Sequence, residues 1–326
     1  MQLKIDEARK LGAEALVRCG MSEYSALQVA DHLIEAALCG HEFSSLPRLI
    51  AIAEELRSRA PAAAIRVTRE DGCFASIDGG DNIAYVVSLV AIDKGIEICR
   101  RTGVAVVTAR NTWFSGRLAY YVERAARLGF VALHTTNTTA RVAPYGGTER
   151  LMGTNPFAVA FPSCDDPLVI DIGTSAITWG DVVLSRTKGE PLPEGVAVGP
   201  DGKPTCDPAA ALEGAFLPWG GQRGSALSIA IQLLGVLAGS PAVIQDSHDF
   251  GLFFVLIDPR RIIPDGSFEA QVSAMRRAIL ANRPVVSGEP VHVPGDGSQA
   301  RRARALAKGE IYLDDRVYER IRTLAQ

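Results

Sequence analysis

Leu217-Pro218-Trp219-Gly220-Gly221-Gln222-Arg223-Gly224-Ser225-Ala226-Leu227 opens a long apolar run. Glycines crowd the turn, Arg223 is a lone cation among them, and a helix follows at once. Backbone N–H groups, a fixed positive charge and a helix N-terminus then meet at one place, a combination that binds anions. The segment is also compatible with an ordinary entry from a loop into a helix.

The apolar run itself contains no charged residue from Gly224 to Gln245, which is long enough to span a membrane. Gly239-Ser240-Pro241 interrupts it, so the remaining helix runs from about Ser225 to Ala238. That is the length of a buried core helix. We therefore predict a core element and no membrane segment.

The overall composition is that of a soluble globular protein. Of 326 residues, 47% are hydrophobic and 22% are charged, and the net charge is −3 with both signs mixed along the chain. The length allows two domains and a large core. The charge pattern gives no basis for a nucleic-acid or membrane-surface partner.

The cysteines and the N-terminus predict a cytoplasmic protein. The six cysteines lie singly and form no Cys-x-x-Cys pair, which is typical of reduced, mostly buried thiols. Asp6 and Glu7 stand where a secretory signal needs an apolar core.

Apolar periodicity predicts helices at both ends of the chain and strands between them. Ser22 is a candidate N-cap for a helix that ends at Gly40, and a second helix starts within residues 41–48. The other predicted helices are Leu118–Ala126, Phe268–Asn282 and one capped by Asp314 or Asp315; the predicted strands are Val104–Thr108, Val131–Leu133, Phe157–Phe161, Leu168–Ile172 and Leu252–Ile257. This order favours an α/β protein whose sheet domain is inserted into a largely helical one.

Conventional nucleotide and metal motifs are nearly absent. Gly295-Asp296-Gly297-Ser298-Gln299-Ala300 matches Gly-x-Gly-x-x-Ala, but only 26 residues follow, too few for a second parallel strand and its crossover. No two of the five histidines have ligand spacing on one helix, so no metal site is predicted. His248, within Asp246-Ser247-His248-Asp249, is interpreted as part of a polar loop. Arg48 and Arg141 are better candidates for carboxylate recognition, although a surface salt bridge explains each alone.

A series of short motifs runs through nearly the whole chain: Gly40, Arg48-Leu49, Val142–Gly147, Gly153–Pro156, Ile170–Ser175, Leu192–Gly195, Asp201–Thr205, Asp207-Pro208, Leu217–Gly224 and Pro294–Asp296. In this order they resemble the malate/L-lactate dehydrogenase family that lacks a Rossmann domain. The resemblance implies a homodimer and an unusual NAD(P)-binding domain built on a mainly antiparallel sheet. The expected division is 1–125 as a helical substrate domain, 126–262 as the NAD(P)-binding domain and 263–326 as returning helices.

The same resemblance implies roles for individual residues. The cofactor, NADPH or NADH, is expected to contact Leu168, Val169, Ile170, Asp171, Ile172, Gly173, Gln222, Arg223, Gly295, Asp296 and Gly297. Arg48 is expected to bind the substrate carboxylate, and Arg141, Thr154 and Asn155 to line the pocket. Within the family, Trp179–Val182 and Gly224–Ser228 most resemble the reductases of Δ1-piperideine-2-carboxylate and Δ1-pyrroline-2-carboxylate. Asp181 matches an acidic position of that branch, and a simple turn residue is the alternative.

Three departures from the family pattern bear on the reaction. Phe43-Ser44-Ser45 replaces the usual Ser-His-Gly, Phe114 replaces a second histidine, and Arg223 replaces a lysine. Reduction of a ketone places negative charge on oxygen, so a proton donor accelerates it by roughly 10²–10⁴-fold. A cyclic imine can enter already protonated and needs no such donor.

The leading prediction is therefore reduction of a cyclic 2-imino acid to proline or pipecolate. Arg48 would hold the carboxylate, Trp113 and Phe114 would flank the ring, and Ser44 would orient the nitrogen or a water. One alternative is a 2-oxo acid dehydrogenase with His41 as the acid, one helical turn before Ser45. Another is a catalytically silent relative that binds nucleotide or metabolite as a sensor.

Overall fold

The chain divides into two compact units. The computed structural model describes residues 1–286 and 288–326. The terminal unit comprises Met1–Ala63 and Arg277–Gln326, and the central unit comprises Ala64–Arg276. The central unit is thus inserted into a discontinuous one, as the sequence suggests, but its boundaries differ from those expected at 125/126 and 262/263. The reason is that three strands before residue 126 belong to the large sheet.

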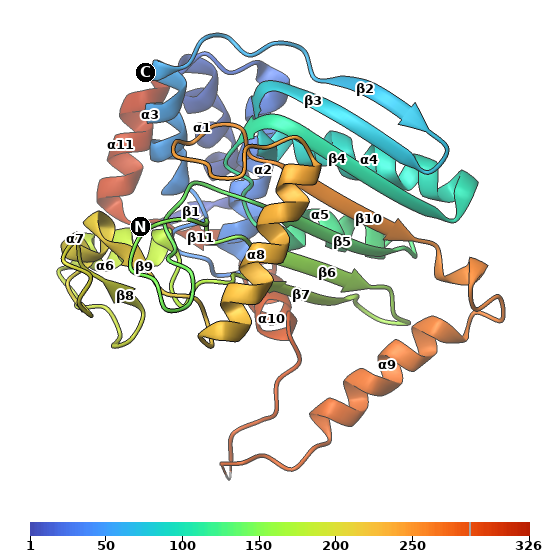
Figure 1. The fold of residues 1–326 in the computed structure, drawn as a ribbon. Helices are drawn as coiled ribbons and strands as arrows, with labels where there is room; N and C mark the ends of the chain where they lie inside the picture. The colour runs from blue at the N-terminus through green and yellow to red at the C-terminus, as the bar shows by residue number, and fades with distance from the viewer. Residues whose placement is uncertain (287) are drawn as a thin grey trace. The chain divides into compact units, whose positions relative to one another are not determined.

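A seven-stranded sheet forms the centre of the inserted unit (Figure 1). Its order is β2 (Arg66–Asp71), β3 (Phe74–Ile83), β4 (Val104–Trp113), β10 (Leu252–Ile257), β5 (Val131–Thr136), β6 (Phe157–Phe161) and β7 (Leu168–Ile172). Neighbouring strands are antiparallel, except that β3 and β4 are parallel. The mainly antiparallel α/β sheet that was predicted is therefore confirmed.

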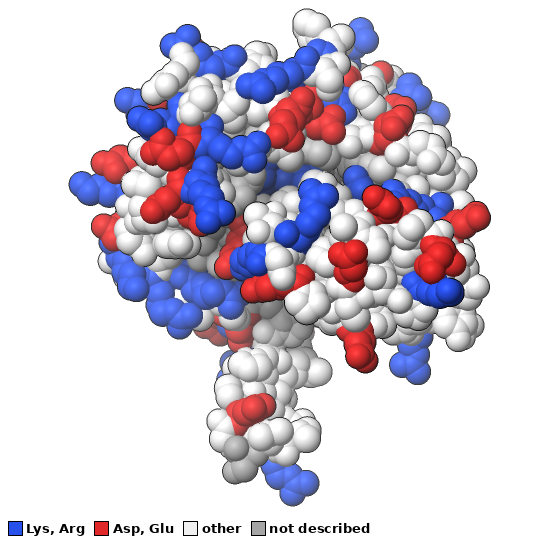
Figure 2. Space-filling view, turned by 90° about the vertical axis from the view of Figure 1, so that its left-hand side faces the viewer, with Lys and Arg blue, Asp and Glu red and all other residues white. Residues whose placement is uncertain are grey.

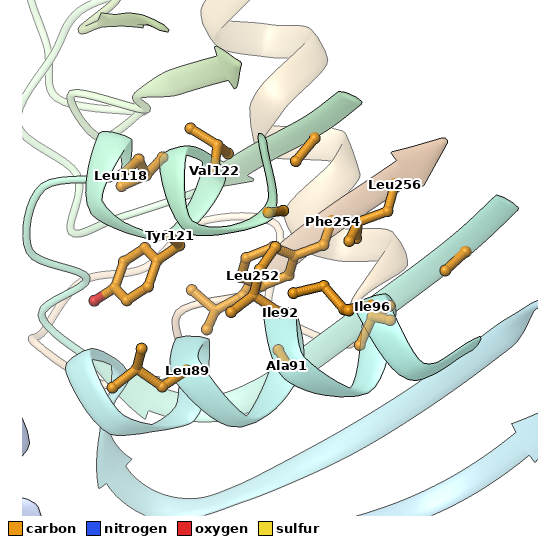
Figure 3. Packing of buried hydrophobic residues seen from close by; sticks show 14 of the residues in the cluster. Leu89, Ala91, Ile92, Ile96, Leu118, Tyr121, Val122, Leu252, Phe254 and Leu256 are labelled. Atoms are coloured by element: carbon orange, nitrogen blue, oxygen red, sulfur yellow. The ribbon is translucent and has the colours of Figure 1, made fainter. Parts of the chain in front are cut away.

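Helices cover both faces of this sheet. Helices α4 (Ala84–Thr102) and α5 (Ala119–Ala126) lie on one face, and α8 (Gln222–Leu237) lies on the other (Figure 1). The main core fills the space beneath α4 and α5, where Ile92 and Tyr121 of the helices meet Leu252, Phe254 and Leu256 of β10 (Figure 3). Alternate residues of each strand enter this core because successive side chains of a strand point to opposite faces.

Smaller elements complete the central unit. They are α6 (Trp179–Lys188), β8 (Ala197–Val198), α7 (Pro208–Glu213), β9 (Ala215–Phe216) and η1 (Pro259–Arg261). Val142, Val182, Leu192 and Phe216 form a second, smaller apolar cluster there. Helix α9 (Ser267–Leu280) begins in this unit, and among its described side chains only Ser273 is buried.

The terminal unit consists of helices and a two-stranded sheet. Its elements are β1 (Gln2–Lys4), α1 (Ile5–Arg18), α2 (Glu23–Leu38), α3 (Arg48–Ser58), α10 (Asp296–Lys308), β11 (Glu310–Tyr312) and α11 (Asp315–Ala325). Strand β1 pairs antiparallel with β11, so the first and last parts of the chain join. Ser22 caps α2 and Asp314 caps α11, and both predicted caps are confirmed.

The helix predicted to start within residues 41–48 is α3, which begins at Arg48, but the helix face predicted for His41 and Ser45 is wrong. Residues 42–47 form a bend and turns. His41 and Ser45 are therefore not one helical turn apart, and their proposed common helix face does not exist. Ser45 instead donates its hydroxyl to the carbonyl of Glu42 at 2.8 Å, which tightens the turn.

The described surface carries charges of both signs. On the face shown in Figure 2, Lys and Arg side chains are interspersed with Asp and Glu. None of the described helices combines the length and the apolarity needed to cross a bilayer. Nor does any cluster of three His, Cys, Asp or Glu side chains with metal-binding geometry occur in 1–286 or 288–326.

Candidate functional site

The turn before α8 joins two segments that lie far apart in the sequence. Trp219 N donates to the carbonyl of Thr174 at 2.8 Å, and Ala176 N donates to Leu217 O at 2.8 Å. A Cβ atom on Gly224 would lie 2.0 Å from the carbonyl oxygen of Trp219, so only glycine allows this turn to close. The end of β7 and the start of α8 are consequently adjacent. The predicted cofactor segments 168–173 and 222–223 are thus brought together.

The start of α8 has features that suit a dinucleotide. Its first N–H groups have no partner within the helix, and Gln222 and Arg223 at this end are exposed. Two exposed aromatic rings lie beside it, Tyr145 and Trp219, and Tyr145 N donates to Ser225 Oγ at 3.0 Å. Helix N–H groups and a guanidinium bind phosphates, and exposed rings can stack on flat bases. The residues present therefore fit NAD(P).

Strand β7 is an edge strand, hydrogen-bonded on one side to β6. Its Asp171 does not turn its carboxylate outward but accepts a hydrogen bond from Ala119 N at 2.8 Å. Burial raises the pKa of the Asp171 carboxyl, against the opposing effects of the α5 backbone hydrogen bonds and Arg117. Asp171 therefore stabilises the start of α5 and sets the position of the strand.

Asn155 lies inside the protein. Its Nδ2 contacts Gln232 Oε1 at 2.9 Å and both oxygens of Ser228 at 3.1 and 3.2 Å, and its Oδ1 accepts from Thr138 N at 3.2 Å. The side chain is fully buried. The neighbouring Thr154 carbonyl accepts from Thr174 N at 3.0 Å. Both residues, expected to line a pocket, thus tie α8 and β7 to the loop that precedes β6.

The predicted aromatic pair divides into one core residue and one partly exposed residue. Trp113 is buried, and its Nε1 donates to Asp81 O at 3.0 Å. Phe114 contacts it edge-on, with ring centroids 5.2 Å apart, and adopts a φ of 45°. Positive φ in a bulky residue costs energy and is often found at functional sites. Of the two rings, Phe114 is the one with surface left for a ligand.

Arg141 and Asp181 meet the start of α6. The guanidinium of Arg141 lies over the ring of Trp179, 5.1 Å from its centroid. Asp181 forms a capping box with Thr178, whose hydroxyl donates to the Asp181 carboxylate at 2.7 Å. These hydrogen bonds of the Asp181 carboxylate are those of a structural residue at a helix start. A structural role was the alternative to a catalytic one.

The remaining predicted residues belong to the terminal unit. Arg48 is the first residue of α3, and its guanidinium lies 5.6 Å from the ring centroid of Phe43. Ser44 lies in the turn just before it. Gly295 is the N-cap of α10 with a φ of 89°, and Asp296 is the first residue of that helix. The Gly295–Gly297 segment is thus a second glycine-led helix start, not a strand-to-helix turn, because residues 291–293 form no strand.

One pair of side chains was not singled out from the sequence. His248 Nδ1 lies 3.6 Å from a carboxylate oxygen of Asp81. The loop of His248 precedes β10 and runs beside the end of β4, where Phe250 N donates to Thr112 O at 2.9 Å. The sequence signal that could have indicated this pair was the predicted strand Leu252–Ile257. The residues just before a strand lie beside the strand that pairs with it, which here is β4.

Comparison with known proteins places this geometry in a family. The sequence profile described as malate/L-lactate dehydrogenase matches residues 3–322. The chain is 31% identical to the L-sulfolactate dehydrogenase of Methanocaldococcus jannaschii, over 99% of this chain and 96% of that protein. It is 32% identical to the (2R)-3-sulfolactate dehydrogenase (NADP(+)) of Chromohalobacter salexigens, over 99% and 98% of the two chains.

A solved structure gives the same relationship. The delta1-piperideine-2-carboxylate reductase of Pseudomonas syringae superimposes with a TM-score of 0.88 at 29% identity, covering 99% of each chain. The profile spans the terminal and the central unit alike, and the relatives match over nearly their whole length. The chain therefore belongs to the malate/L-lactate dehydrogenase family of NAD(P)-dependent oxidoreductases.

Proposed function

We propose that the protein interconverts a 2-oxo acid and the corresponding 2-hydroxy acid with NAD(P)H. One observation carries this proposal: relatives that match almost the entire chain at 31% and 32% identity are named sulfolactate dehydrogenases. An imine reductase is among the similar solved structures, at 29% identity. The alternative 2-oxo acid function is thus better supported than the imine reduction that the sequence favoured.

The structure also weakens one argument for the imine branch. Asp181 suggested that branch because it matches an acidic position there. Its carboxylate accepts hydrogen bonds from the hydroxyl and backbone of Thr178 at the start of α6. A capping role of this kind stabilises a helix in any member of the fold and carries no information about the substrate.

Each remaining site residue has a role in the proposed reaction. Arg48 holds the substrate carboxylate, because a guanidinium matches a carboxylate with two parallel hydrogen bonds. The α8 start, with Gln222 and Arg223, and the α10 start, with Gly295 to Gly297, hold phosphate groups of the cofactor. The bound nicotinamide supplies the hydride for the carbon of the carbonyl group. Phe114 excludes water beside the reacting group.

A second candidate function remains the reduction of a cyclic 2-imino acid. The observation that favours it is the pair Ser44 and Phe114, neither of which is a proton donor of useful strength at neutral pH. This candidate requires that no other side chain supplies the proton. It is therefore decided by the same assays as the main proposal.

We also propose that the protein is a homodimer. On α8, Ile229, Leu233 and Leu237 follow one another at helical spacing, and these residues are 46%, 60% and 67% exposed. Ala226 and Ala230 extend the same exposed face. Contiguous apolar surface on a soluble protein is typical of an association site. A second copy is the occupant that the family resemblance favours.

Steady-state kinetics with NADH and with NADPH test the reaction. Pyruvate, oxaloacetate and 3-sulfopyruvate are compared with Δ1-pyrroline-2-carboxylate and Δ1-piperideine-2-carboxylate. At least one 2-oxo acid is expected to have a kcat/KM about tenfold or more above both imines, equivalent to about 1.4 kcal/mol of transition-state binding. Faster turnover of an imine would replace the main proposal by the second candidate.

A further inference from the structure

Reduction of a carbonyl group leaves a chemical requirement that the predicted site does not meet. The electron pair of the C=O bond moves to oxygen, which needs a proton as the hydride arrives. Ser44 and Phe114 cannot supply it, and His41 is not on the helix face that was expected for it. The central unit, considered alone, contains a histidine in a suitable setting.

Four strained residues mark one edge of the large sheet. Of the five described non-glycine residues with positive φ, four are Asp81, Asn111, Phe114 and Asp249. They stand near the end of β3, at the end of β4 and just before β10. These three segments are neighbours, since Trp113 Nε1 bonds Asp81 O and Phe250 N bonds Thr112 O. Such clustering of unfavourable backbone is a mark of functional sites.

The same edge has the geometry of a ligand site. Strands β3 and β4, with α4 between them, form the parallel pair of the described sheet, and their carboxyl ends meet here. Ligands of α/β proteins bind outside the carboxyl ends of parallel strands. Antiparallel pairing of β10 with β4 continues to the bond between residues 250 and 112. His248 stands two residues before Phe250, and Phe114 stands two residues after Thr112, so both lie just beyond this bond.

Hydrogen bonds hold this edge while leaving the imidazole accessible. Ser240 Oγ donates to Asp249 O at 2.6 Å, and Thr139 Oγ1 donates to Asp246 O at 3.0 Å. On the opposite side, Thr112 Oγ1 donates to Asn82 O at 2.6 Å, next to Asp81. The His248 side chain itself is 50% exposed, against 29% for Asp81. The ring thus stands on a loop that hydrogen bonds hold in place, beside the Asp81 carboxylate of β3, and half of its side-chain surface is exposed to solvent.

We propose that His248, oriented by Asp81, is the proton donor of the 2-oxo acid reaction. The inference rests on the proposed function. As the carbonyl carbon gains a hydride from NAD(P)H, the carbonyl oxygen gains the proton of the His248 imidazolium, which becomes a neutral imidazole. Solvent then restores the proton through the exposed side of the ring. In the oxidative direction the neutral ring takes the hydroxyl proton.

The charged groups around the ring are compatible with this role. The Asp81 carboxylate lies 3.6 Å from Nδ1 of the ring, and Asp249 is the next residue of the loop. Arg110, near the end of β4, packs against Gly239. Asp78 is bonded to Asn111 and Gly80. A distance of 3.6 Å without substrate is normal, because catalytic hydrogen bonds often shorten only in the loaded complex.

Activity of the full-length protein provides the first test. His248→Ala is expected to lower kcat for the best 2-oxo acid by about 10²–10⁴-fold with KM changed by less than about threefold. Added imidazole is expected to restore part of the rate and Asp81→Asn to lower it less, whereas Asp246→Asn, which changes the same loop by one charge, keeps the wild-type rate. A fully active His248→Ala variant would overturn the proposal, and so would a loss of activity that imidazole does not rescue.

A spectroscopic test does not depend on turnover. Oxamate, an inert analogue of a 2-oxo acid, is added with NADH or NADPH to protein with isotope-labelled histidine, and the His248 ring signal is assigned by its loss in His248→Ala. The ring signal is expected to shift with oxamate and cofactor together, and to shift less in Asp81→Asn. An unmoved signal would overturn the role of His248. Failure of wild-type enzyme to reduce any 2-oxo acid would instead overturn the proposed function.

Discussion

His134 shows how strongly a single buried side chain can respond to its surroundings. Its ring stacks on Phe254 with centroids 3.7 Å apart, and Nδ1 donates to Phe253 O at 3.2 Å. Nε2 has no hydrogen-bond partner among the described residues. Burial lowers the pKa of His134 from 6.5 to about 3, only partly opposed by the bond to Phe253. The ring is therefore neutral in the folded protein at all ordinary pH values.

This depressed pKa predicts a loss of stability in mild acid. Above pH 6.5 the ring is neutral in both states and has no effect. Between pH 6.5 and 3 only the unfolded chain binds the proton, so the free energy of unfolding falls by up to about 1.4 kcal/mol per pH unit as pH decreases. His134→Phe is expected to remove that part of the slope in urea titrations from about pH 6 to about pH 4. Leu256→Met, in the same core, should keep the full slope. An unchanged slope in His134→Phe would show that burial of His134 is not the cause of the lost stability.

Arg48 is expected to act through the geometry of its guanidinium. A lysine at this position would keep the charge but lose the two parallel hydrogen bonds that a carboxylate accepts. Arg48→Lys should raise KM for the 2-oxo acid by about 10–100-fold with a smaller change in kcat, equivalent to about 1.4–2.7 kcal/mol. Steady-state kinetics measure this, with Arg57→Lys in the exposed last turn of α3 as control. Equal KM values in the two variants would exclude Arg48 as the carboxylate ligand.

At the scale of elements, α8 is held against the sheet by close packing at Gly235 and by the Asn155 amide. A Cβ atom on Gly235 would lie 2.2 Å from Cγ of Asn137, the residue after β5, so the helix lies as close to that side chain as glycine permits. One and two turns earlier, Asn155 bonds Gln232 and Ser228 of the helix. The position of the proposed phosphate-binding end of α8 therefore depends on these contacts.

Removal of the Asn155 amide should loosen that anchor. Asn155→Ala leaves the buried oxygen of Gln232 and the N–H of Thr138 without their partner, at a cost of about 2–4 kcal/mol in the free energy of unfolding. Urea denaturation measures the loss. Ser163→Ala, which removes an exposed hydroxyl bond in a turn, should cost less than about 1 kcal/mol. Equal costs would mean that the loop before β6 contributes little to holding α8.

Two substitutions of Asp181 distinguish a capping role from a catalytic one. Asparagine keeps much of the capping geometry but cannot act as an acid or base. Asp181→Asn is therefore expected to leave kcat within about threefold of wild type, while Asp181→Ala destabilises the protein by about 1 kcal/mol. Kinetics and thermal unfolding on the same preparations check both. A loss of about 100-fold or more in kcat for Asp181→Asn would restore Asp181 as a catalytic residue.

The elements that could be predicted from the sequence are those with a local signal. Phe157–Phe161, Leu168–Ile172 and Leu252–Ile257 are apolar runs bounded by turn residues, and all three are strands with these ends. Strand β2 escaped prediction because Arg66–Asp71 is polar and wholly exposed. Helix α4 escaped because its Tyr85-Val86-Val87 start favours a strand, and burial against the sheet overrides that preference.

The candidate site was predictable in part for a similar reason. Glycine turns indicate the helix starts at 222 and 295, whereas the cofactor segments were named through the resemblance to the malate/L-lactate dehydrogenase family. Whether Asn155 points inward, or whether His248 meets Asp81, depends on the pairing register of β4 with β10 and on contacts across the sheet. Contacts of this kind join segments that lie far apart in the chain and leave no periodic pattern in either one.

At the scale of the whole molecule, the exposed face of α8 predicts the state of association. Leu233→Glu places a charge at the middle of that face, and it is expected to convert a dimer into a monomer because burial of an unpaired charge is costly. Light scattering after gel filtration measures the mass of each form. Leu128→Glu, at an exposed site beyond α5 on the other side of the sheet, should remain dimeric. A dimeric Leu233→Glu variant would place the interface elsewhere.

The pairing of β1 with β11 has a consequence for biosynthesis. Gln2–Lys4 is translated well before its partner Glu310–Tyr312, because most of the chain lies between them. At about 5–20 residues per second, β1 waits roughly 15–60 s for that partner. The inserted sheet has no such delay, because all seven of its strands lie within residues 64–276. The whole central sheet is therefore translated before β1 can pair with β11.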